Sequence, residues 1–260
     1  MKDVTKASRI VVKVGTSTLT HANGLLNFRR IDELARVLSD LKNEGKKVVL
    51  VSSGAIGVGA AKLGMNGKPH ELKEKQAAAA VGQCELMHIY DKMFQEYGQT
   101  VAQVLLTRDV TDTPERHQHV VNTMDALLEH GAIPVINEND TVAVEEIVYG
   151  DNDTLSAIVA EIAHADLLVL LSDIDGLYDE DPHKNEGACM IPVVYELTDK
   201  IRAAAGGAGT EFGSGGMATK IQAADIALAA GIPMIIANGA RPDVLYEIFE
   251  GKQVGTVFLP

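Results

Sequence analysis

Short aliphatic runs alternate with longer amphipathic segments along the chain. Runs such as IVVKV, VVLVS and LLVLLS carry almost no polar positions, which is typical of strands that are buried on both faces of a sheet. The runs are bounded by glycine or by small polar residues, which mark turns. We therefore predict strands within residues 9–14, 46–54, 100–107, 131–140, 165–173 and 231–239.

The segments between these strands have the apolar spacing and the end signals of helices. Gly45, Gly98 and Gly231 each lie where such a segment stops, as glycine commonly does at a helix end. The predicted helices lie within residues 28–44, 55–64, 71–97, 114–129, 150–165 and 221–231, and a short hairpin or two edge strands are predicted at 141–150. Strands that alternate with helices predict an α/β fold with a mostly parallel sheet covered on both faces. No linker or repeat divides the chain, so we expect one continuous domain.

The composition narrows the classes of function. The 260 residues are 46% hydrophobic and 4% aromatic, with no Trp, which favours an aliphatic α/β core. The formal net charge of −13 argues against general binding to nucleic acids or to anionic membranes, and leaves room for a small positive pocket. Cys84 and Cys189 lie far apart without a C-x-x-C motif, which favours a reducing cytoplasm. The first residues lack the apolar core of a signal peptide, and the run at 167–171 is too short to cross a bilayer.

Small, polar and charged residues collect where the predicted strands end. Ligands of open α/β sheets bind beyond the carboxyl ends of the strands, so these segments should meet at one edge. They are KVGTS (13–17), SSGAIG (52–57), NEND (137–140), SDIDG (172–176) and, before a later helix, SGGMATK (214–220). Taken singly they have structural explanations, because Ser53, Asn137 and Asp140 are common turn residues. Asp151 or Asp153 would likewise suit the N-cap of the helix that follows.

Two lysines in this set are harder to explain as structural residues. Lys13 is near the end of a strand of Ile and Val, where its ammonium group should be buried unless it faces a negative charge. Lys220 falls in or near the first turn of a predicted helix, where the helix dipole disfavours a cation by about 0.3–1 kcal/mol. An anion held by the glycine run, the helix start and Lys220 would explain its position. A surface loop followed by a solvated lysine is the alternative.

The common nucleotide and hydrolase fingerprints are absent from the sequence. There is no G-x-x-x-x-G-K-[ST] or G-x-S-x-G, and the glycines of GAIGVG (54–59) are in the wrong order for dinucleotide binding. Two lysines, several glycine turns and several Asp and Asn remain. This set suits phosphoryl transfer, which depends on positioning and on neutralising charge. It suits best an acceptor that is already anionic, such as a carboxylate, because no histidine base is well placed.

Seven motifs, in this order, resemble the amino-acid kinase family, and within it the kinases that phosphorylate glutamate at the start of proline synthesis. They are KVGTS, VSSGAIGVG, AAVGQ, PVINEND, GDNDTLSA, LLSDIDGLY and GSGGMATKIQAA, and the match runs from about Arg9 to GTVF (255–258). The resemblance implies a three-layer α/β/α sandwich, with the amino acid held by about residues 1–165 and the nucleotide by about residues 166–260. It implies transfer of a phosphoryl group from ATP to the γ-carboxylate of L-glutamate, with Mg²⁺ held through the nucleotide phosphates. Many members carry a further C-terminal RNA-binding-like domain, which this chain is expected to lack.

The resemblance also implies roles for single residues. Lys13 and Lys220 would contact the transferring phosphoryl group, and Asp153 would orient both lysines. The amino acid would be held by residues of the N-terminal part: Ser53, Gly54, Asp140, Asp151 and Asn152. The nucleotide would be held by Lys13 and by residues that follow two later strands: Ser172, Asp173, Ser214, Gly215, Gly216, Met217, Ala218, Thr219 and Lys220. The family usually has Thr where this chain has Ser172 and Ser214, and both replacements keep the hydroxyl group.

Two alternatives remain open at this point. Another family member would use a different acceptor, such as acetylglutamate, aspartate, carbamate or UMP, although NEND and GDND offer carboxylates for a free ammonium group. A non-catalytic nucleotide-binding protein on this fold would be expected to lack one of the two lysines, and both are present. The resemblance further implies a homo-oligomer, either a dimer or a tetramer, and feedback inhibition by proline near residues 140–152.

Overall fold

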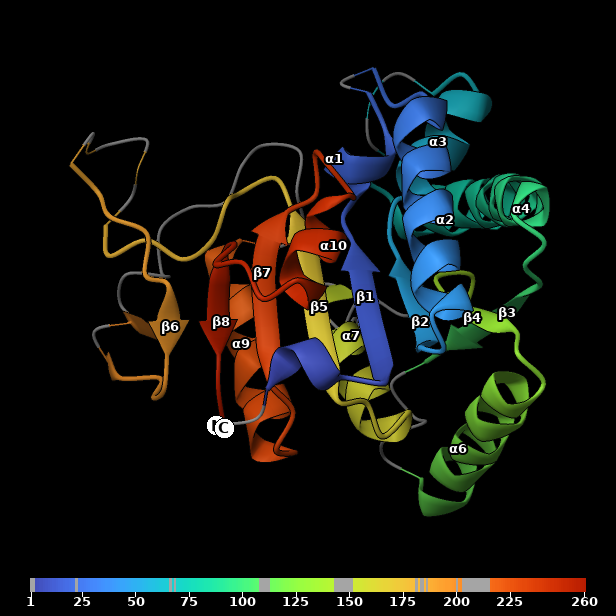
Figure 1. Ribbon diagram of the computed structural model, residues 1–260. Coiled ribbons are helices and arrows are strands. Elements are labelled where there is room, and N and C mark those ends of the chain that lie inside the picture. The colour runs from blue at the N-terminus through green and yellow to red at the C-terminus, as the bar shows by residue number, and fades with distance from the viewer. Residues whose placement is uncertain are drawn as a thin grey trace.

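Eight strands form one sheet at the centre of the molecule (Figure 1). The computed structural model describes residues 3–21, 23–65, 67, 69–107, 113–142, 152–180, 182, 185, 187–199, 201–202 and 216–260. The strands are β1 (Arg9–Val14), β2 (Lys47–Ser52), β3 (Val101–Leu106), β4 (Ile133–Glu138), β5 (Leu167–Ser172), β6 (Val193–Val194), β7 (Met234–Asn238) and β8 (Thr256–Phe258). Their order in the sheet is β3-β4-β2-β1-β5-β7-β8-β6, and every pair is parallel except β7 with β8.

Helices cover both faces of this sheet. They are the 3₁₀ helix η1 (Val4–Lys6) and the α-helices α1 (Thr16–Leu19), α2 (Phe28–Asn43), α3 (Ala55–Lys62), α4 (Leu72–Glu96), α6 (Pro114–Glu129), α7 (Asn152–Ile162), α9 (Met217–Ala229) and α10 (Val244–Phe249). One hydrophobic core joins α2, α4 and α10 to the sheet, and a second core joins α6, α7 and α9 to its other face. These layers confirm the predicted α/β/α sandwich.

The alternation of side chains along β1 decides which layer each residue meets. Ile10, Val12 and Val14 pack into the core that contains α2, whereas Val11 packs into the core that contains α7 and α9. Lys13 is two residues beyond Val11, so it shares the face of α7 and α9. The strand is central in the sheet, because Lys13 pairs with Val51 of β2 on one side and with Leu170 of β5 on the other.

The backbones of α3 and α4 touch where two glycines face each other. A Cβ atom added to Gly59 would lie 1.7 Å from the carbonyl oxygen of Ala78, and one added to Gly82 would lie 1.8 Å from that of Ala55. No side chain fits between helices at this distance. The contact fixes α4 against a helix that begins directly after Gly54, one of the predicted site residues.

The predicted strands and helices are all present in the described residues, with ends shifted by a few residues. The predicted hairpin at 141–150 lies almost wholly outside the described residues. Five short elements were not predicted, because segments of two to six residues carry too little periodicity to be recognised; they are η1, α1, α10, β6 and β8. The antiparallel β8 agrees with a sheet that is mostly, not entirely, parallel.

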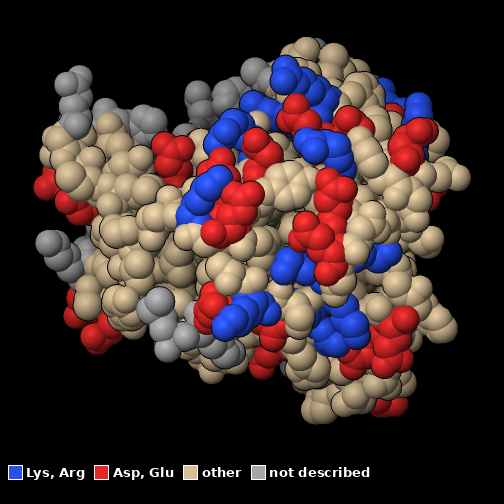
Figure 2. Space-filling model, in the orientation of Figure 1, with Lys and Arg blue, Asp and Glu red and all other residues tan. Residues whose placement is uncertain are grey.

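The surface over α2 and α10 is mixed in charge. Lys and Arg side chains are interspersed with Asp and Glu over the face that Figure 2 shows. Within the part of the chain that the structure describes, no helix has the length and apolar character needed to span a membrane.

Candidate active site

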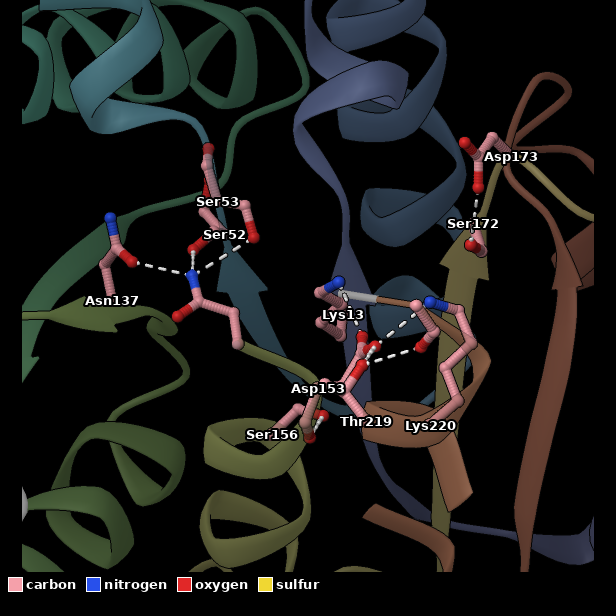
Figure 3. A network of polar contacts seen from close by, with 12 residues as sticks. Lys13, Ser52, Ser53, Asn137, Asp153, Ser156, Ser172, Asp173, Thr219 and Lys220 are labelled. Carbon is pink, nitrogen blue, oxygen red and sulfur yellow. Dashed lines mark hydrogen bonds and ion pairs between the residues drawn. The ribbon is translucent and has the colours of Figure 1, made fainter. Parts of the chain in front are cut away.

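Two lysines and one carboxylate form a buried cluster at the carboxyl end of the sheet (Figure 3). Lys13 Nζ lies 2.6 Å from Asp153 Oδ1, and Lys220 Nζ lies 3.0 Å from Asp153 Oδ2. Lys13 and Lys220 are each 4% exposed and Asp153 is 0% exposed. Three segments that are distant in sequence, namely β1, α7 and α9, therefore place their charged groups in one spot.

The fold explains why these three residues meet. Helices α7 and α9 pack side by side, and both begin near the carboxyl end of the central strands. Asp153 is the second residue of α7, where the helix dipole favours a carboxylate. Lys220 is the fourth residue of α9, where the dipole is unfavourable by about 0.3–1 kcal/mol and the Asp153 carboxylate offsets that cost.

The charges of the cluster are held by one another. Burial alone would raise the pKa of Asp153, but the charges of Lys13 and Lys220 outweigh it and lower that pKa to about 2. Asp153 is therefore ionised at neutral pH. Two ammonium groups and one carboxylate leave a net charge of +1, in a chain whose formal net charge is −13.

The start of α9 adds backbone donors beside the lysines. Gly216 is the N-cap, and as a glycine it has no side chain with which to cap the helix. Thr219 Oγ1 lies 2.8 Å from Gly216 O and 3.0 Å from Asp153 Oδ2, which joins the first turn of α9 to the cluster. Met217 is half-buried and Ala218 is exposed. The predicted residues Ser214 and Gly215 lie outside the described residues.

A second set of contacts surrounds the side-chain amide of Asn152. Its Nδ2 lies 2.6 Å from Ser52 O, 3.1 Å from Ser53 Oγ and 2.8 Å from Asn137 Oδ1. The ends of β2 and β4 are thereby tied to the start of α7. Gly54 follows with a φ of 96°, a conformation that favours glycine, and caps the start of α3. Asp151 lies outside the described residues.

Asp140 lies two residues beyond β4 in a partly buried position. Burial raises the pKa of its carboxyl group to about 6, because the charged form loses contact with water. A cation bound next to this carboxylate would stabilise the charged form again.

Ser172 and Asp173 lie at the end of the strand next to that of Lys13. Strand β5, which ends at Ser172, pairs directly with β1, and Gly15 N donates to Leu171 O across the two strand ends at 3.3 Å. Ser172 Oγ donates to Asp173 Oδ1 at 3.1 Å. Both residues therefore lie one strand away from Lys13.

Asn152 and Asp153 are neighbours in sequence but belong to different sets of contacts. Asn152 bonds to the ends of β2 and β4, and Asp153 bonds to the two lysines. The first turn of α7 thus joins a neutral amide network to a charged cluster.

A model of the amino acid kinase family matches residues 8–238 of this chain. The chain belongs to the amino acid kinase family. Among curated members, the glutamate 5-kinase of Clostridium perfringens is 55% identical over 262 residues, covering 99% of this chain and 97% of the relative. The glutamate 5-kinase of Listeria monocytogenes is 56% identical over 256 residues, covering 97% of this chain and 93% of the relative.

Solved structures of other kinases share the fold. An isopentenyl phosphate kinase of T. acidophilum matches with a TM-score of 0.66 and 19% identity, covering 96% of this chain and 99% of that chain. A UMP kinase of Bacillus anthracis matches with a TM-score of 0.67 and 18% identity, covering 97% and 96%. At these identities the likeness concerns the arrangement of the sheet and helices.

One structural explanation offered for a site residue is wrong. Asp153 is not the N-cap of its helix, since α7 begins at Asn152 and the Asp153 carboxylate contacts the lysines. Sequence reasoning also missed residues that support the amide network, namely Ser52, Gln83 and Tyr90. Gln83 stands in the family motif AAVGQ, which was the available signal.

A cavity of about 700 Å³ lies between the first turns of α2 and residues 240–243, apart from this family's motifs. None of the predicted site residues lines it. Within the described ranges, no group of three or more His, Cys, Asp or Glu side chains is arranged to hold a metal ion.

Proposed function

We propose that the protein transfers the γ-phosphoryl group of ATP to the γ-carboxylate of L-glutamate, which gives L-glutamyl 5-phosphate, the first step of proline biosynthesis. The relatives named glutamate 5-kinase support this proposal, because they match nearly the whole chain at more than half identity. The observation that carries it is the junction at α7. There Asn152, bonded to the ends of β2 and β4, precedes Asp153, which pairs with two buried lysines.

The lysine cluster supports the phosphoryl half of the reaction. Negative charge spreads over the oxygens of the phosphoryl group during transfer, and fixed cations stabilise it without having to reorganise. Asp153 holds the Lys13 and Lys220 ammonium groups in place before the substrate arrives. Backbone N–H groups at the start of α9 would contact the other phosphates, with Ser172 and Asp173 at the end of β5.

The residues around Asn152 support a free amino acid as the acceptor. L-Glutamate has an ammonium group, which suits the partly buried carboxylate of Asp140. Its α-carboxylate suits nearby hydroxyl and backbone donors around Ser53 and Gly54, where glycine permits close approach. An N-acetylated acceptor has no ammonium charge to meet Asp140.

The reaction requires no proton transfer. An oxygen of the γ-carboxylate attacks the γ-phosphorus, the bond from that phosphorus to the bridging oxygen breaks, and ADP leaves with the electron pair. The acceptor is anionic at neutral pH, so no base is needed, but two negative groups must approach each other. Lys13 and Lys220 offset this repulsion.

We propose Mg²⁺ as the metal that accompanies ATP. When bound, it would neutralise part of the charge on the nucleotide phosphates. Both carboxylate oxygens of Asp153 face lysines, so in this proposal the nucleotide phosphates, and not Asp153, are the main ligands of the metal.

A coupled ADP-release assay tests the acceptor. L-Glutamate, L-aspartate, N-acetylglutamate and UMP would be compared at matched concentrations, and hydroxylamine would trap the acyl phosphate as a hydroxamate. We expect the fastest ADP release and the trapped product with glutamate. Faster release with another acceptor would overturn the assignment.

Three further properties belong to the proposal. Proline has an α-carboxylate and an ammonium group, as glutamate does, so it would compete with glutamate near residues 140–152. Initial rates that do not change when proline is added would contradict this.

We expect a dimer or tetramer. Leu25, Phe28 and Leu63 are exposed and offer apolar surface for such an interface, and light scattering tests the oligomeric state.

We also propose that the protein acts in the cytoplasm. The two exposed free cysteines, Cys84 and Cys189, support this location, and cell fractionation tests it.

A further inference from the structure

Gln83 of α4 makes a directional hydrogen bond to the amide network. Its Oε1 accepts from Asn137 Nδ2 at 2.8 Å. The other end of the Asn137 amide, Oδ1, accepts from Glu138 N at 2.9 Å and from Asn152 Nδ2 at 2.8 Å. Asn137 therefore has to point its NH₂ group at an acceptor, and Gln83 supplies one.

The direction of this chain of bonds fixes the orientation of Asn152. Its NH₂ group is used by Asn137, Ser52 and Ser53, so its Oδ1 forms no hydrogen bond to the described residues. That oxygen is available to accept from an ammonium group of a bound amino acid. If the Asn137 amide turned over, two NH₂ groups would face each other and Asn152 would lose this orientation.

Helix α4 holds Gln83 rigidly. The glycine before it, Gly82, is in backbone contact with α3. Tyr90 lies seven residues further, on the same side of the helix, and its hydroxyl group is 2.9 Å from Ser52 Oγ. The helix thereby contacts the ends of both β2 and β4, on either side of the Asn152 amide.

We propose that Gln83 is a positioning residue for the amino-acid substrate: its Oε1 fixes the Asn137 amide, and through it the Asn152 amide that receives the ammonium group. The proposal rests on the function proposed above. Gln83 acts through an acceptor atom and takes no part in phosphoryl transfer.

Three variants test this role. Gln83→Met removes the acceptor with little change in length, and we expect the KM for glutamate to rise about 5- to 20-fold. The kcat, the KM for ATP and the thermal midpoint should change little. Gln83→Glu keeps an acceptor oxygen, replaces the NH₂ group with a second oxygen and adds a negative charge, so its KM for glutamate should not rise more than about twofold above the wild type at a pH where Glu is ionised. Gln95→Met, at an exposed position of the same helix, is the matched control.

The outcomes separate positioning from two other roles. If Gln83→Glu loses as much affinity as Gln83→Met, the NH₂ group is what matters and the proposal fails. If Gln83→Met lowers the thermal midpoint and raises both KM values equally, the residue is merely structural. An unchanged KM for glutamate in Gln83→Met also overturns the proposal.

A measurement without turnover distinguishes this failure from failure of the proposed function. The side-chain amide signals of Asn152 in a ¹⁵N spectrum should shift in Gln83→Met and remain nearer their wild-type positions in Gln83→Glu. Unmoved signals in Gln83→Met overturn the positioning role. A wild type that does not phosphorylate glutamate but shows these shifts would refute only the proposed function.

Discussion

The two sides of the first turn of α7 are held in place by different interactions. On one side, Asp153 and its two lysines are buried charges that stabilise one another, so few other arrangements of these side chains would keep the charges paired. On the other side, neutral amides around Asn152 form uncharged hydrogen bonds, whose direction depends on which end of each amide faces its neighbour. A buried charge that loses its partner is costly, whereas an amide that loses one partner can turn and find another. The charged side should therefore control stability and turnover, and the amide side should control substrate affinity.

The largest expected effect is on stability, in Asp153→Asn. This change leaves two nearly buried lysines without a counter-charge, and we expect the free energy of unfolding to fall by about 3–5 kcal/mol, with loss of turnover. Chemical denaturation measures it. Asp225→Asn, which removes the partner of exposed Arg202, is the control and should cost less than about 1 kcal/mol. Equal stability of the two variants would show that the cluster is not a charge-compensated unit.

The next largest effect is on turnover, in Lys13→Ala and Lys220→Ala. Each variant removes one cation that is needed most while the phosphoryl group is in transfer, so kcat should fall about 10²- to 10³-fold, or about 3–4 kcal/mol. Lys→Arg should not restore it fully, because a broad guanidinium does not fit a site shaped for a compact ammonium.

The exposed pair Lys62–Glu85 supplies the control for these variants, since Lys62→Ala should leave kcat unchanged. Steady-state rates and thermal midpoints are measured together. A Lys220→Ala variant with full kcat and unchanged stability would make Lys220 an ordinary helix residue.

A smaller effect, confined to affinity, is expected for Asn152→Ala. The variant loses the amide that links β2, β4 and α7, and the KM for glutamate should rise about 10- to 100-fold with a smaller change in kcat. Asn122→Ala on the exposed surface of α6 is the control. If kcat falls as far as in the lysine variants, the division between the two sides of α7 does not hold.

The smallest effect is a pH dependence through Asp140. Its pKa of about 6 means that the carboxylate, and with it the attraction for an ammonium group, is present above pH 6 and lost as pH falls. At about pH 5 only roughly a tenth remains ionised, so the KM for glutamate should rise about tenfold relative to neutral pH. Asp140→Asn should have a high KM that no longer depends on pH in this range. A wild-type KM that is constant from neutral pH down to about pH 5 contradicts this assignment.

The sequence was sufficient to predict the layers of the fold and the charged residues of the site. It was not sufficient to predict which side chains of the site contact one another. Aliphatic runs predicted β1 and β5 because burial on both faces leaves a local pattern. The ion pair between Lys13 and Asp153 joins a strand and a helix that are far apart in the chain, so no local pattern predicts it. The residues around Asp153 suited a helix N-cap as well as a partner for lysine. Gln83 lies 54 residues from Asn137, and its place in the motif AAVGQ does not indicate which residue it contacts. Such roles arise only when tertiary packing brings α4 to the end of β4.

The contact between Gly59 and Gly82 has a consequence for engineering thermostability. Replacing helix glycines with alanine commonly stabilises a protein by about 0.4–1 kcal/mol, since alanine restricts the unfolded chain and favours the helix. Both glycines are in helices and neither has a positive φ, so a consensus or propensity rule would select them. Here an added methyl group would collide with a backbone carbonyl oxygen and push α4 away from α3. A search for a more heat-resistant variant should therefore exclude these two positions and direct glycine replacements elsewhere.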